Sequence, residues 1–172
     1  LIGHSMGVQV ALQCAISHPD MARAVVLVCG APGNPLATFH DTDLMRYIFP
    51  WMRRFVETAP NAAQAMWSLV TPLDITRTYA KLMEVNGSFV RDEDFIPYFK
   101  DLAEMDIDVF TRMVQYIDEH STEPHLPQLA IPALVIAGEK DTFTPSWVSH
   151  RMHRMIPDAE LLDVRGGSHT VP

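Results

Sequence analysis

The chain has 172 residues, of which 48% are hydrophobic and 20% are charged, a composition typical of a globular domain. A largely disordered chain is therefore excluded, and no apolar run approaches the roughly 18 residues that a membrane-spanning helix needs. Thirteen basic and 21 acidic residues give a formal net charge of −8, which disfavours nucleic acid or another polyanion as a partner.

The acidic excess lies in one segment of the chain. Residues 92–123 contain ten acidic and two basic residues, so the remainder of the chain is neutral. Such a cluster is typical of a solvated helical face rather than of a binding site. The two cysteines, Cys14 and Cys29, lie in apolar stretches and form neither a disulfide framework nor a metal-ligand spacing.

Residues 1–33 have the pattern of a strand end, a tight turn, a helix and a second strand. Leu1-Ile2 is the end of an apolar strand, and residues 8–17 carry apolar side chains at helical spacing. Pro19 ends that helix, and the valine-rich run 24–29 is typical of a strand buried on both faces of a parallel sheet. Because the chain opens on Leu1 at the end of a strand, we expect the natural N-terminus to lie upstream, so no signal peptide can be sought.

Residues 34–125 form a second region, and their pattern is helical. This region holds 13 of the 15 aromatic residues of the chain, together with six of its methionines. Four or five helices are expected, with breaks near Pro60, Pro72, Asn86-Gly87 and Asp106. One expectation is that these helices bury one apolar face internally and present another to a ligand, and the alternative is that the apolar side chains form only the internal core of the region.

Residues 126–172 return to the pattern of strand, helix and strand. In chain order we expect a strand, a loop, a helix and a strand over residues 131–137, 138–143, 145–155 and 160–164. Thr144 is predicted to be the N-cap of the helix, with Pro145 in its first position. A glycine-rich loop, 165–169, follows the last strand. Strands that alternate with helices predict an α/β fold with a parallel sheet.

The turn after the first strand reads Gly3-His4-Ser5-Met6-Gly7, which matches Gly-x-Ser-x-Gly between an apolar strand and an amphipathic helix. A serine on such a sharp turn holds its hydroxyl clear of the sheet, and the glycines on either side let the backbone pass closely. Free N–H groups at the start of the following helix favour a developing negative charge. An ordinary N-capping serine is the alternative, and the strand and helix around the motif favour a nucleophile.

A serine nucleophile needs a base, and His169 is the best candidate among eight histidines. It follows the last strand in a glycine-rich loop, from which a side chain reaches the carboxyl edge of the sheet. His4 is the rival, although its place inside the turn favours packing there. His150 and His153 lie three residues apart on a helix without a third ligand, so we expect surface positions for both.

The orienting acid is predicted to be Asp141, in the loop that follows the strand before the last. The loops of Asp141 and His169 then project from nearby strand ends, at the edge where α/β sheets carry their sites. Glu139 is the near alternative, and loop capping is the ordinary role for either acid.

With these residues in the order Ser5, Asp141 and His169, the chain resembles the α/β-hydrolase family, whose nucleophile, acid and histidine follow the same order. The resemblance implies an α/β-hydrolase fold with an inserted helical cap, and it covers the C-terminal portion of such an enzyme. It divides the chain into core, cap and core at residues 1–33, 34–125 and 126–172. The family's other acid position, after its sixth strand, has no acid here, which again favours Asp141.

The resemblance implies a serine hydrolase with Ser5 as nucleophile, His169 as base and Asp141 as orienting acid. The backbone N–H of Met6 becomes one oxyanion donor, and a second donor is expected from a loop before Leu1. We expect an enzyme that cleaves an ester or related acyl bond of a small, apolar molecule, with no metal and no cofactor. A serine nucleophile disfavours the dehalogenase and epoxide-hydrolase branches, which use aspartate.

Other activities remain open on the same three residues: carbon–carbon bond hydrolase, lactonase, thioesterase, perhydrolase and acyltransferase. A non-catalytic ligand-binding relative is the alternative of a different class, and the complete set of three residues argues against it. We expect a cytoplasmic protein without a membrane span, and we leave its oligomeric state open.

Overall fold

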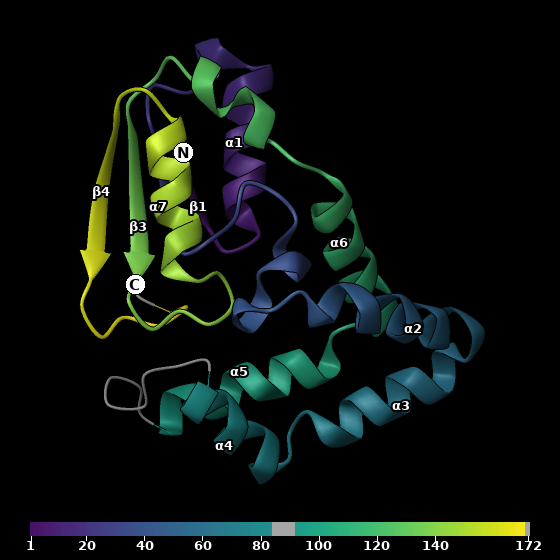
Figure 1. The fold of residues 1–172 in the computed structure, drawn as a ribbon. Coiled ribbons are helices and arrows are strands. Elements are labelled where there is room, and N and C mark those ends of the chain that lie inside the picture. Colours follow the sequence, from purple (N-terminus) through teal and green to yellow (C-terminus); the bar gives the residue numbers. More distant parts are fainter. Residues whose placement is uncertain (84–91, 171–172) are drawn as a thin grey trace.

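The computed structural model describes residues 1–83 and 92–170, and its core is a parallel sheet (Figure 1). Within these residues the sheet has four strands: β1 (Ile2–His4), β2 (Val25–Val28), β3 (Ala133–Gly138) and β4 (Ala159–Val164). They lie side by side in chain order and run in the same direction, with Gly3 opposite Leu27, Leu27 opposite Val135 and Val135 opposite Leu161. The predicted α/β fold with a parallel sheet is confirmed.

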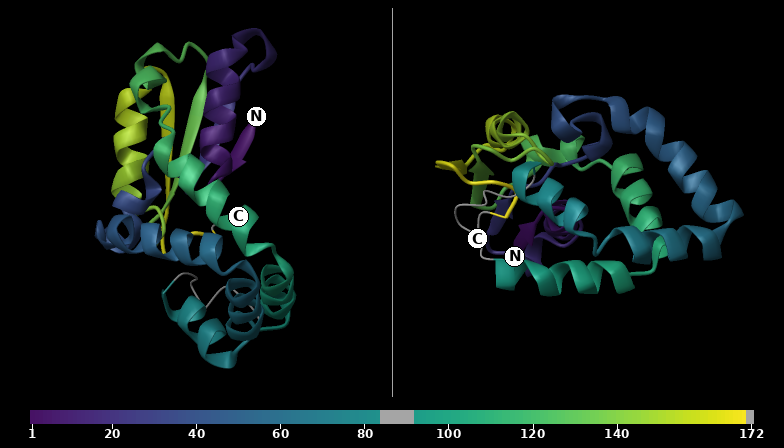
Figure 2. Two further views of the ribbon diagram at one scale, coloured as in Figure 1. Left: turned by 90° about the vertical axis from the view of Figure 1, so that its right-hand side faces the viewer. Right: turned by 90° about the horizontal axis from the view of Figure 1, so that it is seen from below.

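Helices cover one face of this sheet, the face that carries the side chains of Leu27 and Val135 (Figure 2). α1 (Gly7–Ser17) and α7 (Ser146–Met155) both lie on this face, whereas Ile2 and Leu162, on the opposite face, are 80% and 48% exposed. Side chains from both helices and from the central strands are fully buried between the layers, among them Leu12, Leu27, Val135 and Met152. Burial of each such side chain contributes about 1.5–3 kcal/mol, so this core fixes the strands and the loops at their carboxyl ends.

The start of α7 differs from the sequence prediction. The helix begins at Ser146, one residue after Pro145, and no side chain caps it. The hydroxyl of Thr144 donates instead to a carboxylate oxygen of Asp141, at 2.8 Å. The predictions of Thr144 as N-cap and of Pro145 in the first position are wrong: the hydroxyl of Thr144 bonds to Asp141, and Pro145 itself lies at the N-cap position.

Among the described residues, five helices lie between β2 and β3 in the chain and beyond the carboxyl ends of the strands (Figure 1). They are α2 (Leu44–Thr58), α3 (Pro60–Val70), α4 (Asp74–Met83), α5 (Asp92–Glu104) and α6 (Ile107–Glu119). We refer to these five helices, together with the short turn Phe39–Asp41 that leads into α2, as the cap. None of the helices in the described part of the chain is long and apolar enough to cross a membrane.

Three of the predicted helix breaks coincide with ends of cap helices. α3 begins at Pro60, Pro72 lies between α3 and α4, and Asp106 precedes α6. The carboxylate of Asp106 caps α6, since it accepts from two N–H groups of the first turn. The expected break at Asn86-Gly87 lies outside the described residues, and the division into core, cap and core at the stated residues stays a prediction.

The chain enters and leaves the cap at neighbouring points. Gly33 and Ser121 form an isolated antiparallel bridge, and a Cβ on Gly33 would lie 2.4 Å from the Ser121 hydroxyl. Beside this bridge, the buried Thr122 donates from its backbone N–H and from its hydroxyl to the carbonyl of Pro32. These contacts hold the two connecting segments together where they meet the sheet.

An ion cluster joins α2 to α6 inside the cap. The guanidinium of Arg53 on α2 donates to Asp108 at 2.6 Å and lies 3.2 Å from Glu57 on its own helix. Arg112 on α6 also donates to Asp108. The hydrogen bonds from Arg112 and then from Arg53 hold the pKa of Asp108 below its usual value of 3.8. The hydrogen bond to Asp108 in turn raises the pKa of the Arg112 guanidinium.

We expect Asp108→Asn to lower the melting temperature near neutral pH, and we expect the difference in melting temperature from the wild type to shrink in acid. Because the folded-state pKa of Asp108 lies below its unfolded value, the stabilisation from its charge is complete above about pH 5 and declines as the pH falls below 3.8. Thermal unfolding of wild type and variant at several pH values checks this. A difference in melting temperature that stayed constant in acid would contradict it, and Asp101→Asn, an exposed acid of α5, serves as the control.

Candidate active site

Ser5 lies on the turn between β1 and α1, at the carboxyl edge of the sheet. Its φ is 54°, a left-handed conformation that is strained for a residue with a side chain. Backbone bonds hold it there: the N–H of Ser5 donates to the carbonyl of Val28 at 3.0 Å, and its carbonyl accepts from the N–H of Val8 at 3.1 Å. This sharp turn is the geometry expected from the Gly-x-Ser-x-Gly motif.

The hydroxyl of Ser5 meets the imidazole of His169, which follows β4. Oγ of Ser5 lies 2.8 Å from Nε2 of His169, and Nδ1 of His169 lies 3.1 and 3.0 Å from the two carboxylate oxygens of Asp141. A carboxylate only accepts, so Nδ1–H donates to Asp141 and Nε2 accepts from the hydroxyl of Ser5. The three residues selected from the sequence therefore form one hydrogen-bonded chain.

Asp141 is enclosed by the protein and receives hydrogen bonds from its own loop. Its side chain has no exposed surface, whereas that of His169 is 12% exposed. The N–H groups of Phe143 and Thr144 donate to Oδ1 at 2.9 Å each, and the Thr144 hydroxyl donates to Oδ2. A buried carboxylate needs such donors, and here they also fix the side that it presents to His169.

The rival residues weighed from the sequence lie close by and anchor the histidine loop. Nε2 of His4 donates to the carbonyl of His169 at 2.7 Å, and the carboxylate of Glu139 accepts from the N–H of Gly166 at 2.7 Å. Glu139 thus has the loop-capping role that was its alternative. The prediction that His4 packs inside its own turn is wrong, because its exposed ring reaches across to the histidine loop.

The histidine pair of α7 lies on a partly exposed face of that helix. His150 is 2.7 Å from Asp163 of β4, and neither His150 nor His153 is buried. Within residues 1–83 and 92–170, no group of three histidine, cysteine or acidic side chains is arranged to hold a metal ion.

Met6 precedes the first turn of α1. Free N–H groups and the helix dipole at such an end favour negative charge. Its backbone N–H therefore stands where an oxyanion donor next to Ser5 is expected, and that role stays a prediction.

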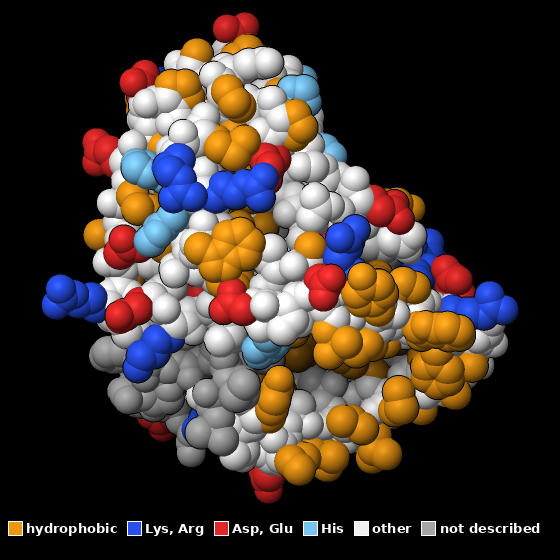
Figure 3. All heavy atoms as spheres, in the orientation of Figure 1, with side chains coloured by type: hydrophobic (Ala, Val, Ile, Leu, Met, Phe, Trp, Pro, Cys, Tyr) orange, Lys and Arg blue, Asp and Glu red, His pale blue; other side chains and the backbone are white. Residues whose placement is uncertain are grey.

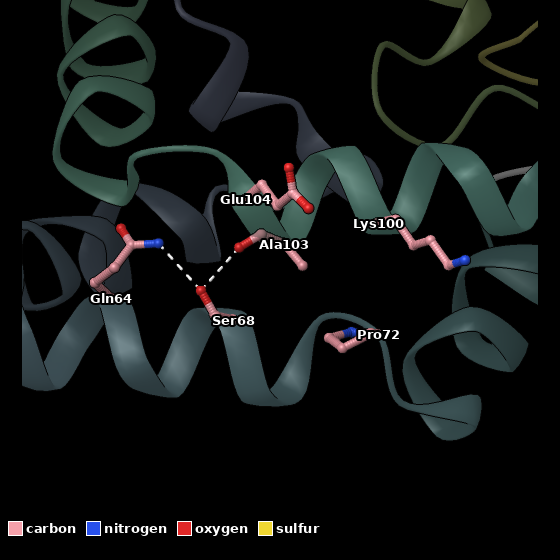
Figure 4. A pocket seen from close by; sticks show the side chains of 6 residues that line it. All are labelled: Gln64, Ser68, Pro72, Lys100, Ala103 and Glu104. Atoms are coloured by element: carbon pink, nitrogen blue, oxygen red, sulfur yellow. Dashed lines mark hydrogen bonds between the residues drawn. The ribbon is translucent and has the colours of Figure 1, made fainter.

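A depression of about 410 Å³ lies within the cap, between α3 and α5 (Figure 4). It is lined by Gln64, Ser68, Pro72, Lys100, Ala103 and Glu104. Gln64 donates to the hydroxyl of Ser68, which donates to the carbonyl of Ala103, so the lining also joins the two helices. None of Ser5, Asp141 and His169 contributes to it.

The whole chain, residues 1–172, matches the sequence profile of the Alpha/beta hydrolase family. The chain belongs to the alpha/beta hydrolase family. The family and the fold class that were expected from Ser5, Asp141 and His169 are thereby confirmed.

Three similar proteins give the extent of the match. The uncharacterized hydrolase YugF of Bacillus subtilis (strain 168) is 27% identical over 173 residues, which cover 100% of this chain and 59% of YugF. The magnesium-chelatase 30 kDa subunit of Rhodobacter capsulatus is 30% identical over 170 residues, 97% of this chain and 55% of that protein. The esterase EaEST from Exiguobacterium antarcticum superposes with a TM-score of 0.69 at 16% identity, over 99% of this chain and 59% of EaEST. This alpha/beta hydrolase chain therefore spans less than two thirds of the length of each.

The glycines around Ser5 in this alpha/beta hydrolase are not equivalent. A Cβ on Gly3 would lie 2.2 Å from the carbonyl oxygen of Gly7, and one on Gly30 would lie 2.4 Å from that of Ser5. A Cβ on Gly7 would meet nothing within 4 Å. The prediction that both motif glycines permit a close passage is therefore wrong for Gly7. Gly30 was missed as a site residue because it lies in the loop after β2, and its contact is with Ser5 in the turn after the neighbouring strand, β1.

We expect Gly3→Ala and Gly30→Ala to destabilise the fold and displace Ser5, whereas Gly7→Ala is tolerated. A methyl group at the first two positions overlaps backbone atoms that can move only with the whole turn. At Gly7, the first residue of α1, alanine favours the folded state by about 0.4–1 kcal/mol. Thermal unfolding of the three variants checks this, and a Gly7→Ala protein that melted below Gly3→Ala would contradict it.

Proposed function

We propose that this member of the alpha/beta hydrolase family cleaves the ester bond of a small, apolar acyl substrate. The proposal is carried by the hydrogen-bonded chain from Ser5 to His169, at 2.8 Å, and from His169 to the buried Asp141, at 3.0 Å. A serine hydroxyl becomes nucleophilic when an oriented base accepts its proton, and this chain supplies both the base and its orienting acid. The relatives named as a hydrolase and an esterase support the same class of reaction.

The reaction follows from this chain in two halves. In the first, Oγ of Ser5 attacks the acyl carbon while Nε2 of His169 takes its proton and then returns that proton to the leaving alcohol. In the second, His169 takes a proton from water, which attacks the acyl group on Ser5, and then returns that proton to Oγ of Ser5 as the bond to the acyl group breaks and the carboxylic acid leaves. Asp141 holds the imidazole in the tautomer that both halves need and stabilises the charge that the ring carries between them.

Negative charge develops on the substrate oxygen in each half of the reaction. The backbone N–H of Met6, at the start of α1, is proposed as one donor to that oxygen. A donor of this kind is typically worth about 3–4 kcal/mol in the transition state. The proposal requires a second donor, which we place in the part of the fold that precedes Leu1.

The cap supports an apolar acyl group as the substrate. On α2, the exposed side chains of Leu44, Ile48, Trp51 and Phe55 follow one another at spacings of four and three residues, which places them on one face of the helix. Figure 3 shows hydrophobic side chains gathered over α2 and α3. Because water is expelled when an acyl chain covers such side chains, each buried methylene contributes up to about 0.8 kcal/mol.

Lactonase, thioesterase, perhydrolase, acyltransferase and carbon–carbon bond hydrolase activities use the same three residues, and ester hydrolysis is the reaction that we place first. A non-catalytic ligand-binding role has no need of a base hydrogen-bonded to the Ser5 hydroxyl. The hydrogen-bonded chain therefore favours a catalyst over a binding protein.

We expect Ser5→Ala to abolish ester hydrolysis in the full-length protein without changing its melting temperature by more than a few degrees. The substitution removes the attacking oxygen but leaves His169 bound to Asp141. A fluorophosphonate probe, which labels activated serines, should label the wild type and not the variant. Ser149→Ala is the control, because Ser149 is buried on α7 with a hydroxyl that has no partner among the described residues. Labelling that persisted in Ser5→Ala would remove Ser5 from the nucleophile role.

We expect kcat/KM for p-nitrophenyl esters to rise with acyl length up to a limit set by the cap. The expected gain is at most about fourfold per methylene, the equivalent of about 0.8 kcal/mol. Steady-state kinetics from acetate to longer acyl esters measures the profile. A flat profile, or a preference for acetate with a steep loss beyond it, would refute an apolar acyl substrate and leave the exposed side chains of α2 without this role.

A further inference from the structure

We propose that Phe143 is a positioning residue for the imidazole of His169, and that the first turn of the cap holds Phe143 in place. The proposal rests on the function proposed above, since it concerns how the base of that reaction is oriented. It adds a residue outside the Ser5–His169–Asp141 chain and links the rate of the reaction to the cap.

The hydrogen bonds of His169 leave one rotation of its ring open. Nδ1 bonds to Asp141 and Nε2 bonds to Ser5, and both bonds lie near the plane of the ring. Two such bonds at opposite sides fix the axis that joins the nucleophile to the acid. Rotation of the ring about that axis moves Cγ and is limited by the torsions of the side chain, and a contact with the face of the ring limits it further.

Phe143 supplies a contact with the face of the ring. Its ring centroid lies 4.8 Å from that of His169, with only 23° between the two planes, which is a stacked arrangement. The N–H of Phe143 also donates to Oδ1 of Asp141, so the same residue touches both the acid and the base. During the reaction the imidazole carries a positive charge, and the negative face of an aromatic ring attracts that charge.

The cap holds Phe143 through the short turn Phe39–Asp41, which we call the cap turn. The ring of Phe39 meets that of Phe143 edge to face, at 4.8 Å and 89°. The backbone N–H of His40 donates to the carbonyl of Thr142 at 2.7 Å. On its other side, the carboxylate of Asp41 accepts from Nε1 of Trp147 on α7, at 2.8 Å. The cap turn is thus bound to residues on both sides of Phe143.

Two features of the cap turn are unfavourable in free energy: its backbone conformation and a buried nitrogen atom without a hydrogen bond. His40 and Asp41 both have left-handed backbone, with φ values of 53° and 56°, which residues with a side chain rarely adopt. Nε2 of His40 is buried and has no hydrogen-bond partner among the described residues. Strain of this kind persists only where the surroundings hold the chain firmly, and it is concentrated at functional sites. The contacts of the cap turn with Phe143, Thr142 and Trp147 are what hold it here.

The test compares kcat and KM of variants for one p-nitrophenyl ester in the full-length protein. Phe143→Leu keeps an apolar side chain but removes the flat face, and we expect kcat to fall about tenfold with KM unchanged within about twofold. Phe143→Tyr keeps the face and should restore kcat to within about threefold of the wild type. Phe39→Leu leaves Phe143 in place without its edge contact, and we expect kcat to fall by an intermediate factor.

Phe110→Leu is the matched control, because Phe110 stacks on Trp67 inside the cap and the same substitution there removes an aromatic pair away from His169. All variants are assayed well below their melting temperatures. An equal loss of kcat in Phe110→Leu, or a Phe143→Tyr as slow as Phe143→Leu, would overturn the proposal. If Ser5→Ala is inactive and Phe143→Leu matches the wild type, only this inference fails. If Ser5→Ala retains activity, the proposed function itself fails.

Discussion

The candidate site depends on all four strands running in the same direction. In a parallel sheet the carboxyl ends of the strands lie at one edge, so the loops after β1, β3 and β4 meet there although the chain separates them widely. Backbone bonds continue this pairing past the strands, since the N–H of Cys29 donates to Ile136 and that of Glu139 donates to Val164. A slip of one residue between any two strands would turn alternate side chains to the other face of the sheet. The hydroxyl of Ser5 and the imidazole of His169 would then part.

The cap and the sheet are joined at two different places. One is the pair of connecting segments at Gly33 and Ser121, which fixes where the cap is attached. The other is the contact of Phe39 with Phe143, which lies directly beside the imidazole of His169. Within the cap, polar contacts between helices keep it in one arrangement, as where the indole of Trp67 on α3 donates to a carbonyl of α5. The second contact therefore joins the cap to the residues around His169 itself.

Ser5, Asp141 and His169 could be selected from the sequence because each lies in a loop directly after an apolar strand, and local patterns are enough to mark such positions. Helix breaks at prolines were predictable for the same reason. The roles of Gly30 and Phe143 were not, because each depends on a contact with a residue in the loop after another strand: the carbonyl of Ser5 for Gly30, and the ring of His169 for Phe143. A single sequence contains no local signal for contacts of that kind, which arise only when the strands have been placed in order.

The bridge between Gly33 and Ser121 has a consequence for how such proteins diversify. Because the two ends of the helical segment meet at one point, a segment of different length can begin and end there while the sheet and the loops of Ser5, Asp141 and His169 keep their positions. Exchange of this segment is thus a route by which evolution, or an engineer, changes the helical surface beyond the strand ends without rebuilding the sheet. The contact at Phe39 sets the condition for such a graft: the new insert must still place a side chain against Phe143.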